Sequence, residues 1–399
     1  MLEIIEDEIN APSVFTDEEK FSFEYIPSNL LHREQQMRKL ASYFRNLFQG
    51  AKNFRTTVLI TGEVGTGKTT LSKIFGLMIE KSGQNRNKKI KYIHINCRKL
   101  NKASLILANI LGKLIPHFPL RGFSTAELIR ILRDTLDQKN MSLLLSLDEI
   151  DFLLKNDVSS DLLYNLARLN EDSIKQISGI SLIIISRFAG LHRELDKLTR
   201  SSFPYNVIHL EKYDKNQFLD ILKERAKDGL RQGALSEESL IFLAESAVEI
   251  GDTRYAIELL WRSGKIADQE RSDFISTEHI QKAKVKVYPF SESTLHDLPL
   301  HQKFVLLALS KGLSTQSIQG LNIGDLEEYY RQICLEYNAK PRKHTRIWYY
   351  VQQLASLGII SVRIRNEDMR GRTTYITLPN ISSKLLSEKV QEIVENSSK

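Results

Sequence analysis

The residues best suited to chemistry form a glycine-rich loop that ends in Lys-Thr. The loop contains Gly62, Glu63, Val64, Gly65, Thr66, Gly67, Lys68, Thr69 and Thr70. Glycines allow backbone angles that turn successive N–H groups toward a phosphate, and a following helix adds its positive N-terminal end. Lys68 can reach the β- and γ-phosphates, and the Thr69 hydroxyl can ligate Mg²⁺. The sequence therefore predicts a site for ATP or ADP with Mg²⁺.

The segments on either side of the loop support this interpretation. Residues 56–60 are apolar and β-branched, which is typical of a buried strand, and residues 71–80 have a helical pattern. A glycine-rich turn beside an unrelated lysine would need neither segment. The order strand, loop, Lys-Thr and helix is the context of a P-loop.

A second pair of reactive side chains follows the apolar run 142–147. Asp148 and Glu149 come directly after that predicted strand. Asp148 would hold the Mg²⁺ shell, and Glu149 would orient and polarise an attacking water. Such a pair is common by itself, but downstream of a P-loop it indicates the second half of an ATPase site.

Composition limits the class of protein. The chain has 399 residues, enough for two or three domains, and carries 56 basic against 49 acidic residues. The only cysteines are Cys97 and Cys334, too far apart for a CxxC pair, which favours a reducing compartment and no zinc site. No apolar run approaches a membrane span, and the acidic N-terminus lacks an apolar signal segment. We therefore expect a cytoplasmic, nucleoid-associated protein with no membrane partner.

The pattern of elements predicts an α/β fold. Further strands are expected at 91–97, 180–185 and 206–210, with helical segments between them. Alternating strands and helices indicate a parallel five-stranded sheet covered on both faces. From Asp214 to about Lys286 the pattern is wholly helical, which predicts a small separate bundle.

The C-terminal region predicts a winged helix. Three helical segments, 300–309, 324–337 and 344–357, precede two alternating strands joined by a turn at 366–371. Three helices and a β-hairpin make this variant of helix-turn-helix. Between Lys340 and Arg372 there are eight Lys or Arg and two acidic residues, a local balance of +6.

Basic residues of the winged helix are the candidate DNA contacts. They open the third helix or flank the wing tip, and they are Arg342, Lys343, Thr345, Arg346, Arg370 and Arg372. A solvated basic face is the alternative interpretation. Trp348, Tyr349 and Tyr350 are more typical of core or groove-rim aromatics than of stacking platforms.

Together these motifs resemble an AAA+ ATPase, and more narrowly the archaeal replication initiators related to the origin recognition complex and the cell-division-cycle helicase loader. The narrower match rests on short motifs as well as the tail. These motifs are Tyr25-Ile26-Pro27, Leu31-His32-Arg33-Glu34-Gln35, Ile95-Asn96-Cys97 and Gly251-Asp252-Thr253-Arg254. The resemblance covers about residues 20–380.

The resemblance implies further site residues. Arg254 would be a sensor on the helical lid that reaches the γ-phosphate, although it could instead pair with Glu258 four residues on. His32 and Arg33 would lie where the family closes over the adenine, or they could be a solvated helix start. Residues 101–123 correspond to the family's DNA-touching insert. This segment is mostly apolar, so the sequence is equally compatible with a helix that only packs against the core.

Two departures from the family bear on hydrolysis. Arg187 stands where the family usually has an asparagine that positions the hydrolytic water. Leu198 stands at the position of the arginine finger, and Arg200 could replace it only if the backbone shifts. The chain is therefore expected to bind ATP and to hydrolyse it slowly, if at all.

The expected domain order follows from these segments. It is a flexible acidic leader at 1–20, an AAA+ core at 21–213, a helical lid at 214–288, a linker at 289–299, a winged helix at 300–380 and a C-terminal helix or tail at 381–399.

The favoured function is an ATP-dependent replication initiator that binds double-stranded origin DNA through the insert and the winged helix. By resemblance it would help recruit the replicative helicase, and it could assemble on DNA with itself or with a paralogue. One alternative is a Holliday-junction branch-migration motor, which also joins an AAA+ core to a winged helix. Another is a transcription regulator whose DNA binding is gated by nucleotide.

Overall fold

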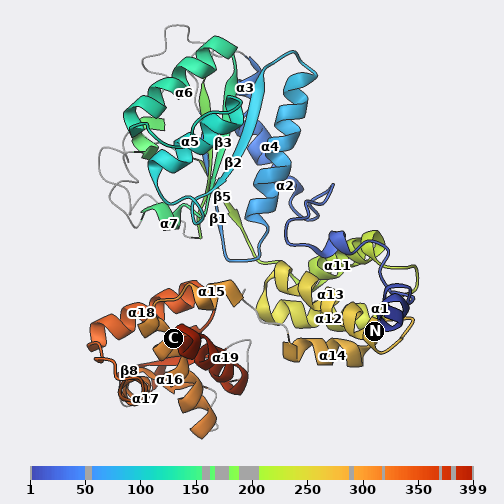
Figure 1. Ribbon diagram of the computed structural model, residues 1–399, viewed down its shortest axis with the longest axis vertical. Coiled ribbons are helices and arrows are strands. Elements are labelled where there is room, and N and C mark those ends of the chain that lie inside the picture. Colours follow the sequence, from blue (N-terminus) through green and yellow to red (C-terminus); the bar gives the residue numbers. More distant parts are fainter. Residues whose placement is uncertain are drawn as a thin grey trace. The chain divides into compact units, whose positions relative to one another are not determined.

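The computed structural model describes residues 2–49, 56–154, 162–166, 179–187, 206–286, 292–316, 320–367, 371–378 and 383–397. The chain divides into two compact units (Figure 1). One unit is Phe23–Tyr213, and the other combines Met1–Ser22 with Asp214–Lys399. Among the described residues, no helix is both long and apolar enough to cross a membrane.

The first unit is built on a five-stranded sheet (Figure 1). Its strands are β1 (Thr57–Gly62), β2 (Ile90–Asn96), β3 (Ser142–Asp148), β4 (Ile180–Ile185) and β5 (Asn206–Leu210). Their order is β2-β3-β4-β1-β5, and every neighbouring pair is parallel. The predicted parallel sheet is therefore confirmed. All five strands end at the same edge, and the glycine loop and Asp148 lie at that edge.

Helices cover both faces of this sheet, because alternate residues along each strand point to opposite faces. Val58 and Ile60 share a core with α2 (Glu34–Tyr43) and α4 (Lys68–Gln84). Leu59 shares the other core with α5 (Ala103–Leu114) and α6 (Thr125–Lys139). The described part of this unit also contains two short helices, α3 (Asn46–Gln49) and α7 (Asp151–Leu154), and a helical segment at residues 162–166.

Four helices form the lid in the second unit. They are α11 (Lys215–Gly229), α12 (Glu237–Ile250), α13 (Thr253–Gln269) and α14 (Thr277–Lys286). Polar side chains set their starts: Asp214 and Gln217 form a capping box at α11, and Asp252 caps α13. The helical bundle expected from Asp214 onward is present.

The acidic leader is not free of the rest of the chain, in contrast to our expectation. It contains α1 (Leu2–Ile9) and a 3-10 helix, η1 (Glu18–Phe21). Between them, Thr16 donates its backbone N–H to Gly229 O at 2.9 Å, and Arg231 donates to Val14 O at 2.8 Å. Val14 and Phe21 are buried. Counting acidic residues missed these apolar side chains, which pack the segment onto the lid.

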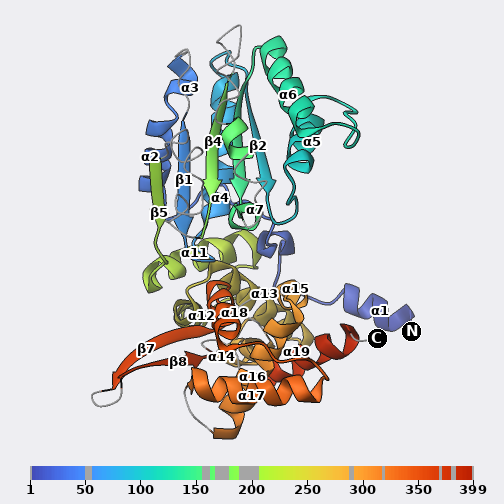
Figure 2. The ribbon, with the colours of Figure 1, turned by 90° about the vertical axis from the view of Figure 1, so that its left-hand side faces the viewer.

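The winged helix has the predicted three helices and hairpin, with additions at both ends. Its elements are α15 (Glu292–His296), α16 (Leu300–Gln316), β6 (Leu321–Asn322), α17 (Ile323–Glu336), α18 (His344–Ser356), β7 (Ser361–Glu367), β8 (Gly371–Thr377) and α19 (Ser383–Ser397). The strands form an antiparallel sheet in the order β6-β8-β7, and the hairpin of β7 and β8 projects from the helices of this domain (Figure 2). Leu295 and Leu298 are buried in its core. Part of the expected linker 289–299 therefore belongs to this domain.

Candidate functional site

The glycine loop runs from the end of β1 into α4 in a conformation that requires glycine. Gly62 has φ 147° and Gly67 has φ 87°, in the region that disfavours side chains. A Cβ on Gly62 would lie 2.4 Å from the backbone oxygen of Leu210. The loop and the end of β5 are therefore in direct backbone contact, and the helix that follows begins at Lys68.

Lys68 lies against the inside of this loop. Its Nζ donates to the backbone oxygens of Gly62 at 2.7 Å and Glu63 at 2.5 Å. The ammonium group is thus held at the positive end of α4, where phosphate groups bind. This geometry fits the predicted phosphate site.

Thr69 and Asp148 meet across the same edge of the sheet. The Thr69 hydroxyl donates to Asp148 Oδ2 at 2.6 Å, and Asp148 is 2 % exposed. Mg²⁺ beside a nucleotide takes one or two protein oxygens and completes its shell with water and phosphate. Among the described residues, no group of three or more His, Cys, Asp or Glu is placed to hold a metal alone. The oxygen pair therefore fits Mg²⁺ that arrives with nucleotide.

Glu149 has a strained backbone and two polar partners. Its φ of 53° is uncommon for a residue with a side chain, and such strain is often found at functional sites. Its carboxylate accepts from Asn96 Nδ2 at 3.1 Å and pairs with Arg187 Nη2 at 3.5 Å. Asn96 was part of a motif in the sequence but was given no role. Its register opposite Asp148, at the ends of β2 and β3, brings it here.

Arg187 is itself positioned by Asp151. The Asp151 carboxylate accepts the Ser186 hydroxyl at 2.6 Å and the Arg187 backbone N–H at 3.0 Å. Arg187 therefore enters the site at a fixed backbone position, beside Glu149. Leu198 and Arg200, which bear on the arginine finger, lie outside the described residues.

His94 contributes a neutral group beside Asp148. Its Nε2 lies 3.5 Å from Asp148 Oδ2. Burial, together with the charges of Lys73 and Lys113, lowers the pKa of His94 to about 4. Burial and the nearby carboxylates raise the pKa of the Cys97 thiol to about 12. Neither residue is therefore a charged or nucleophilic member of the site at neutral pH.

Arg33 supports the loop from within the protein. It is 4 % exposed, and its Nη2 donates to Thr66 O at 3.2 Å and to Glu211 O at 2.6 Å. Its guanidinium carbon lies 3.9 Å from the centre of the Tyr213 ring. These contacts tie the glycine loop to the segment after β5. His32, which has φ 60°, is half-buried at the turn into α2.

Arg254 lies near the start of α13 in the lid, in the other compact unit. Its backbone N–H donates to Asp252 Oδ1 at 2.8 Å, and its side chain is exposed. The alternative partner, Glu258, pairs with Arg262 at 2.9 Å. The role of Arg254 as a sensor stays a prediction.

The predicted DNA-contacting residues of the third helix gather at the start of α18. Arg342, Lys343, Thr345 and Arg346 are all exposed there. The wing residues are described less fully: Arg370 lies outside the described residues, and the backbone of Arg372 pairs with Asn366 near the tip of the hairpin. Four of the six predicted DNA-contacting residues therefore lie together at the start of α18.

The insert at 101–123 contains α5, which packs its apolar side chains against the sheet. Lys113 donates from Nζ to the backbone oxygen of His94 at 3.2 Å. Beyond the helix, Phe118 and Phe123 stack with ring centres 5.5 Å apart, and Leu120 is 60 % exposed. A packing helix and an exposed apolar turn therefore occur together in this segment.

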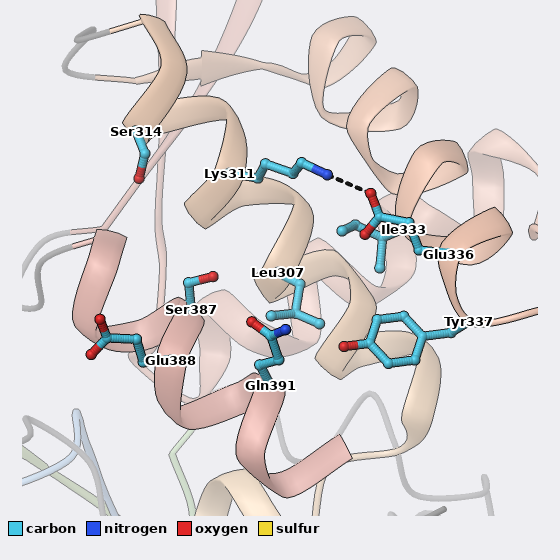
Figure 3. A pocket seen from close by; sticks show the side chains of 9 residues that line it. All are labelled: Leu307, Lys311, Ser314, Ile333, Glu336, Tyr337, Ser387, Glu388 and Gln391. Atoms are coloured by element: carbon cyan, nitrogen blue, oxygen red, sulfur yellow. Dashed lines mark hydrogen bonds and ion pairs between the residues drawn. The ribbon is translucent and has the colours of Figure 1, made fainter. Parts of the chain in front are cut away.

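A pocket of about 470 Å³ lies between α16, α17 and α19 of the winged helix (Figure 3). Leu307 and Ile333 supply buried apolar side chains to its lining. Lys311 Nζ donates to Glu336 Oε1 at 2.5 Å across it. Because these two charges pair with each other, the pocket offers no set of groups that converge on one ligand, and we assign it no role.

Comparisons with known proteins agree with the geometry. Three family models match this chain: an AAA domain at residues 53–192, the Cdc6 AAA+ ATPase-type lid domain at 219–285, and the CDC6 C-terminal winged helix domain at 293–388. Among solved structures, the ORC1 protein of Aeropyrum pernix in complex with DNA is similar with a TM-score of 0.72 and 25% identity. That similarity covers 95% of this chain and 97% of the other.

Curated relatives match over nearly the whole chain. The ORC1-type DNA replication protein 2 of Sulfurisphaera tokodaii is 31% identical over 99% of this chain and 95% of its own length. The protein of the same name from Sulfolobus acidocaldarius is 33% identical over 94% of this chain and 92% of its own length. The resemblance to archaeal initiators is confirmed: this chain belongs to the family of ORC1-type DNA replication proteins, with an AAA+ P-loop ATPase core, a lid and a C-terminal winged helix.

Proposed function

We propose that this protein is an ATP-dependent replication initiator that binds double-stranded origin DNA and helps recruit the replicative helicase. The observation that carries the proposal is the exposed basic start of α18, with Arg342, Lys343 and Arg346. The same chain has a glycine loop whose geometry fits a phosphate site. The name and DNA complex of the Aeropyrum pernix relative support the DNA-binding part. The names of the curated relatives support the role in replication.

In the proposed nucleotide site, Lys68 would contact phosphate oxygens, and Thr69 and Asp148 would share the shell of Mg²⁺. Bound ATP would supply the phosphoanhydride bond between its β- and γ-phosphates, which ADP lacks. Glu149 Oε1 and Oε2 would orient a water and accept its proton. Arg254 would add a positive charge from the lid. ATP would then bias the arrangement of the DNA-contacting elements, as a ligand that binds one state better than another does.

Turnover in this site is proposed to be slow. Both carboxylate oxygens of Glu149 already have a partner, Asn96 at Oε2 and Arg187 at Oε1, so a water must compete with these contacts for the carboxylate. An arginine finger is worth on the order of 10³–10⁵ in rate in GTPases, and the family's finger position holds Leu198 here. Nucleotide would thus act as an assembly switch, with self-assembly or pairing with a paralogue on DNA as its outcome.

DNA binding would divide between base contacts and phosphate contacts. The major groove presents distinct donor and acceptor patterns, so α18 is the element suited to sequence preference. A wing hairpin is suited to the backbone or the minor groove, so Arg370 and Arg372 would mainly add affinity. The insert at 101–123 would supply a third contact.

A salt-titrated anisotropy series on an origin fragment and a scrambled duplex tests this division. Each phosphate contact removed should flatten the log–log salt slope by about 0.9. Arg372→Ala should weaken binding to both duplexes alike and flatten the salt slope. Arg346→Ala should instead narrow the difference in affinity between the origin fragment and the scrambled duplex. If a chain lacking residues 300–399 keeps both affinities, the winged helix is not the DNA-binding element.

Mapping of chromatin occupancy tests the role in the cell. An initiator should collect at one or a few origins, and origin-bound protein should retain the replicative helicase in a pull-down. Occupancy at many promoters would instead support a nucleotide-gated regulator. Brisk hydrolysis stimulated by DNA junctions would support the branch-migration motor.

A further inference from the structure

Arg346 is exposed on the first turn of α18, yet its guanidinium group is held by two aromatic residues of the same helix. Its guanidinium carbon lies 4.9 Å from the ring centre of Tyr349 and 5.4 Å from that of Tyr350. Its Nε donates to the Tyr350 hydroxyl at 3.4 Å. Residues three and four positions apart are neighbours on a helix surface, so these contacts follow from the spacing. The arginine is therefore ordered before any ligand arrives.

The tyrosine that accepts this hydrogen bond is fixed in the core. Tyr350 is 7 % exposed, and its ring stacks on His301 with an interplanar angle of 5°. Tyr349 is 45 % exposed, and its hydroxyl bonds to Gln353 Nε2 at 2.7 Å instead of to the arginine. Tyr350 thus presents its hydroxyl, and Tyr349 presents its ring face, to the same guanidinium group.

The backbone before α18 is anchored on the same aromatic cluster. Arg342 donates its backbone N–H to the buried Tyr330 hydroxyl at 3.3 Å, and that hydroxyl bonds to His301 Nδ1 at 2.8 Å. Burial and the nearby charge of Arg342 lower the pKa of His301, so its ring is neutral at pH 7. The start of α18 and the Arg346 side chain are therefore both anchored by hydrogen bonds to buried tyrosines in the core of the winged helix.

The hydrogen bond at Nε determines which donors Arg346 has left. A guanidinium group has five N–H donors, and with Nε occupied the remaining pairs are on Nη1 and Nη2. These two nitrogens form an end that matches two acceptors side by side. In the major groove, only guanine presents such a pair, O6 and N7. The other bases present a donor or a methyl group next to one acceptor, or a donor alone.

We propose that Arg346 reads a guanine in the major groove through its Nη1–Nη2 end, and that Tyr350 is the positioning residue that selects this geometry. This inference rests on the proposed DNA-binding function and adds to it the base that the helix recognises. An arginine without such support can turn to a phosphate, which adds affinity but carries no sequence information. Tyr350 therefore contributes preference rather than general affinity.

The matched variants are Tyr350→Phe and Tyr349→Phe. Each removes one hydroxyl and keeps the ring, so stacking and core packing are preserved. Only the Tyr350 hydroxyl bonds to Arg346, whereas the Tyr349 hydroxyl bonds to Gln353. A loss of preference confined to Tyr350→Phe would therefore separate positioning from packing.

The experiment uses the full chain and a random library of 20-base-pair duplexes. The duplex preferred by the wild type is remade with each guanine in turn replaced by 7-deazaguanine, which lacks N7, and affinities are measured by fluorescence anisotropy at one salt concentration. At one guanine the wild type should lose roughly 5- to 100-fold in affinity, the range for a bidentate contact. Arg346→Ala should be insensitive to the replacement at that position.

The tyrosine variants complete the test. In Tyr350→Phe the preference for guanine over 7-deazaguanine at that position should fall about three- to tenfold, which is part of the effect of a bidentate contact. Its affinity for the random library should stay within about twofold of the wild-type value. Tyr349→Phe should match the wild type. The inference would be overturned if Tyr350→Phe and the wild type showed the same preference for guanine over 7-deazaguanine. It would also be overturned if no 7-deazaguanine replacement weakened the wild type more than Arg346→Ala, even if the protein binds DNA. If the wild type binds no duplex, the proposed function fails and the inference fails with it.

Discussion

At the scale of single residues, the ATPase site combines a loop prepared for phosphate with a restrained carboxylate. Lys68 is already held at the helix start by two backbone oxygens, so binding of phosphate requires little reorganisation. Glu149, by contrast, is in contact with Asn96 and Arg187. In the proposed site, nucleotide binding and hydrolysis would therefore depend on different side chains, and substitutions should separate them.

Lys68→Ala tests the binding half. The substitution deletes a charge-assisted contact to phosphate, and we expect nucleotide affinity to fall about 10- to 100-fold, as measured by calorimetry. Lys81→Ala is the matched control, because Lys81 lies in the last turn of the same helix. Unchanged affinity in Lys68→Ala would disprove the assignment of the loop.

Arg187→Asn tests the hydrolytic half. If the pair with Arg187 restrains Glu149, its removal should raise steady-state turnover about fivefold, equivalent to the roughly 1 kcal/mol of a partly exposed ion pair. The same change in a Glu149→Gln background should have no effect. A fall in turnover would instead mean that Arg187 stabilises the transition state directly.

At the scale of elements, the sequence predicted the strands and helices because their patterns are local. The apolar runs that became β1 to β5 and the helical pattern from Asp214 onward needed no knowledge of distant residues. The P-loop and Asp148 were predictable as well, since parallel strands place their carboxyl ends at one edge. The contacts of Arg33 and of Arg187 were not, because their partners lie far away along the chain.

The position of the N-terminal segment also depends on contacts with distant residues, which the local sequence pattern did not reveal. Its acidic composition predicted a flexible leader, whereas two apolar residues, Val14 and Phe21, determine where it lies. A Cβ on Gly229 of α11 would meet the Phe21 ring at 2.4 Å and the Asp17 backbone oxygen at 2.9 Å. A glycine at the end of α11 is thus explained by a residue more than two hundred positions away.

Gly229→Ala should therefore destabilise the lid, although alanine is the better helix former. Overpacking of this kind costs about 1–3 kcal/mol, against a gain of roughly 0.5–1 kcal/mol from helix propensity. Amide exchange of α11, measured by mass spectrometry, should become faster. In a Phe21→Ala background the cost should become smaller, because the ring is removed and only the approach to the Asp17 backbone oxygen remains. If Gly229→Ala slows exchange in the otherwise unchanged chain, the packing of the leader on the lid is wrong.

At the scale of the whole molecule, nucleotide and the DNA contacts of the winged helix would lie in different compact units. The P-loop belongs to Phe23–Tyr213, and the winged helix belongs to the unit that includes Asp214–Lys399. The chain passes between the units after Ser22 and after Tyr213. The second connection follows Arg33's partners Glu211 and Tyr213, so the segment that leaves the core is the one tied to the glycine loop.

This connection predicts coupling between nucleotide and DNA. Thermodynamic linkage requires that, if ATP changes the affinity for duplex by some factor, the duplex changes the affinity for ATP by the same factor, typically 5- to 150-fold. Both factors can be measured, the first by anisotropy with a non-hydrolysable ATP analogue against ADP, the second by calorimetry with and without duplex. The two ratios should agree within error.

Arg33→Lys should reduce both the effect of ATP on the affinity for duplex and the effect of duplex on the affinity for ATP. Lysine keeps the positive charge but lacks the planar group that contacts Thr66, Glu211 and Tyr213 at once. Lys68→Ala should abolish the effect of nucleotide on DNA while leaving the affinity for duplex without nucleotide intact. Equal affinity for duplex in the ATP-analogue and ADP states of the wild type would contradict the role of ATP as a switch, because a ligand that binds both states equally cannot shift their populations.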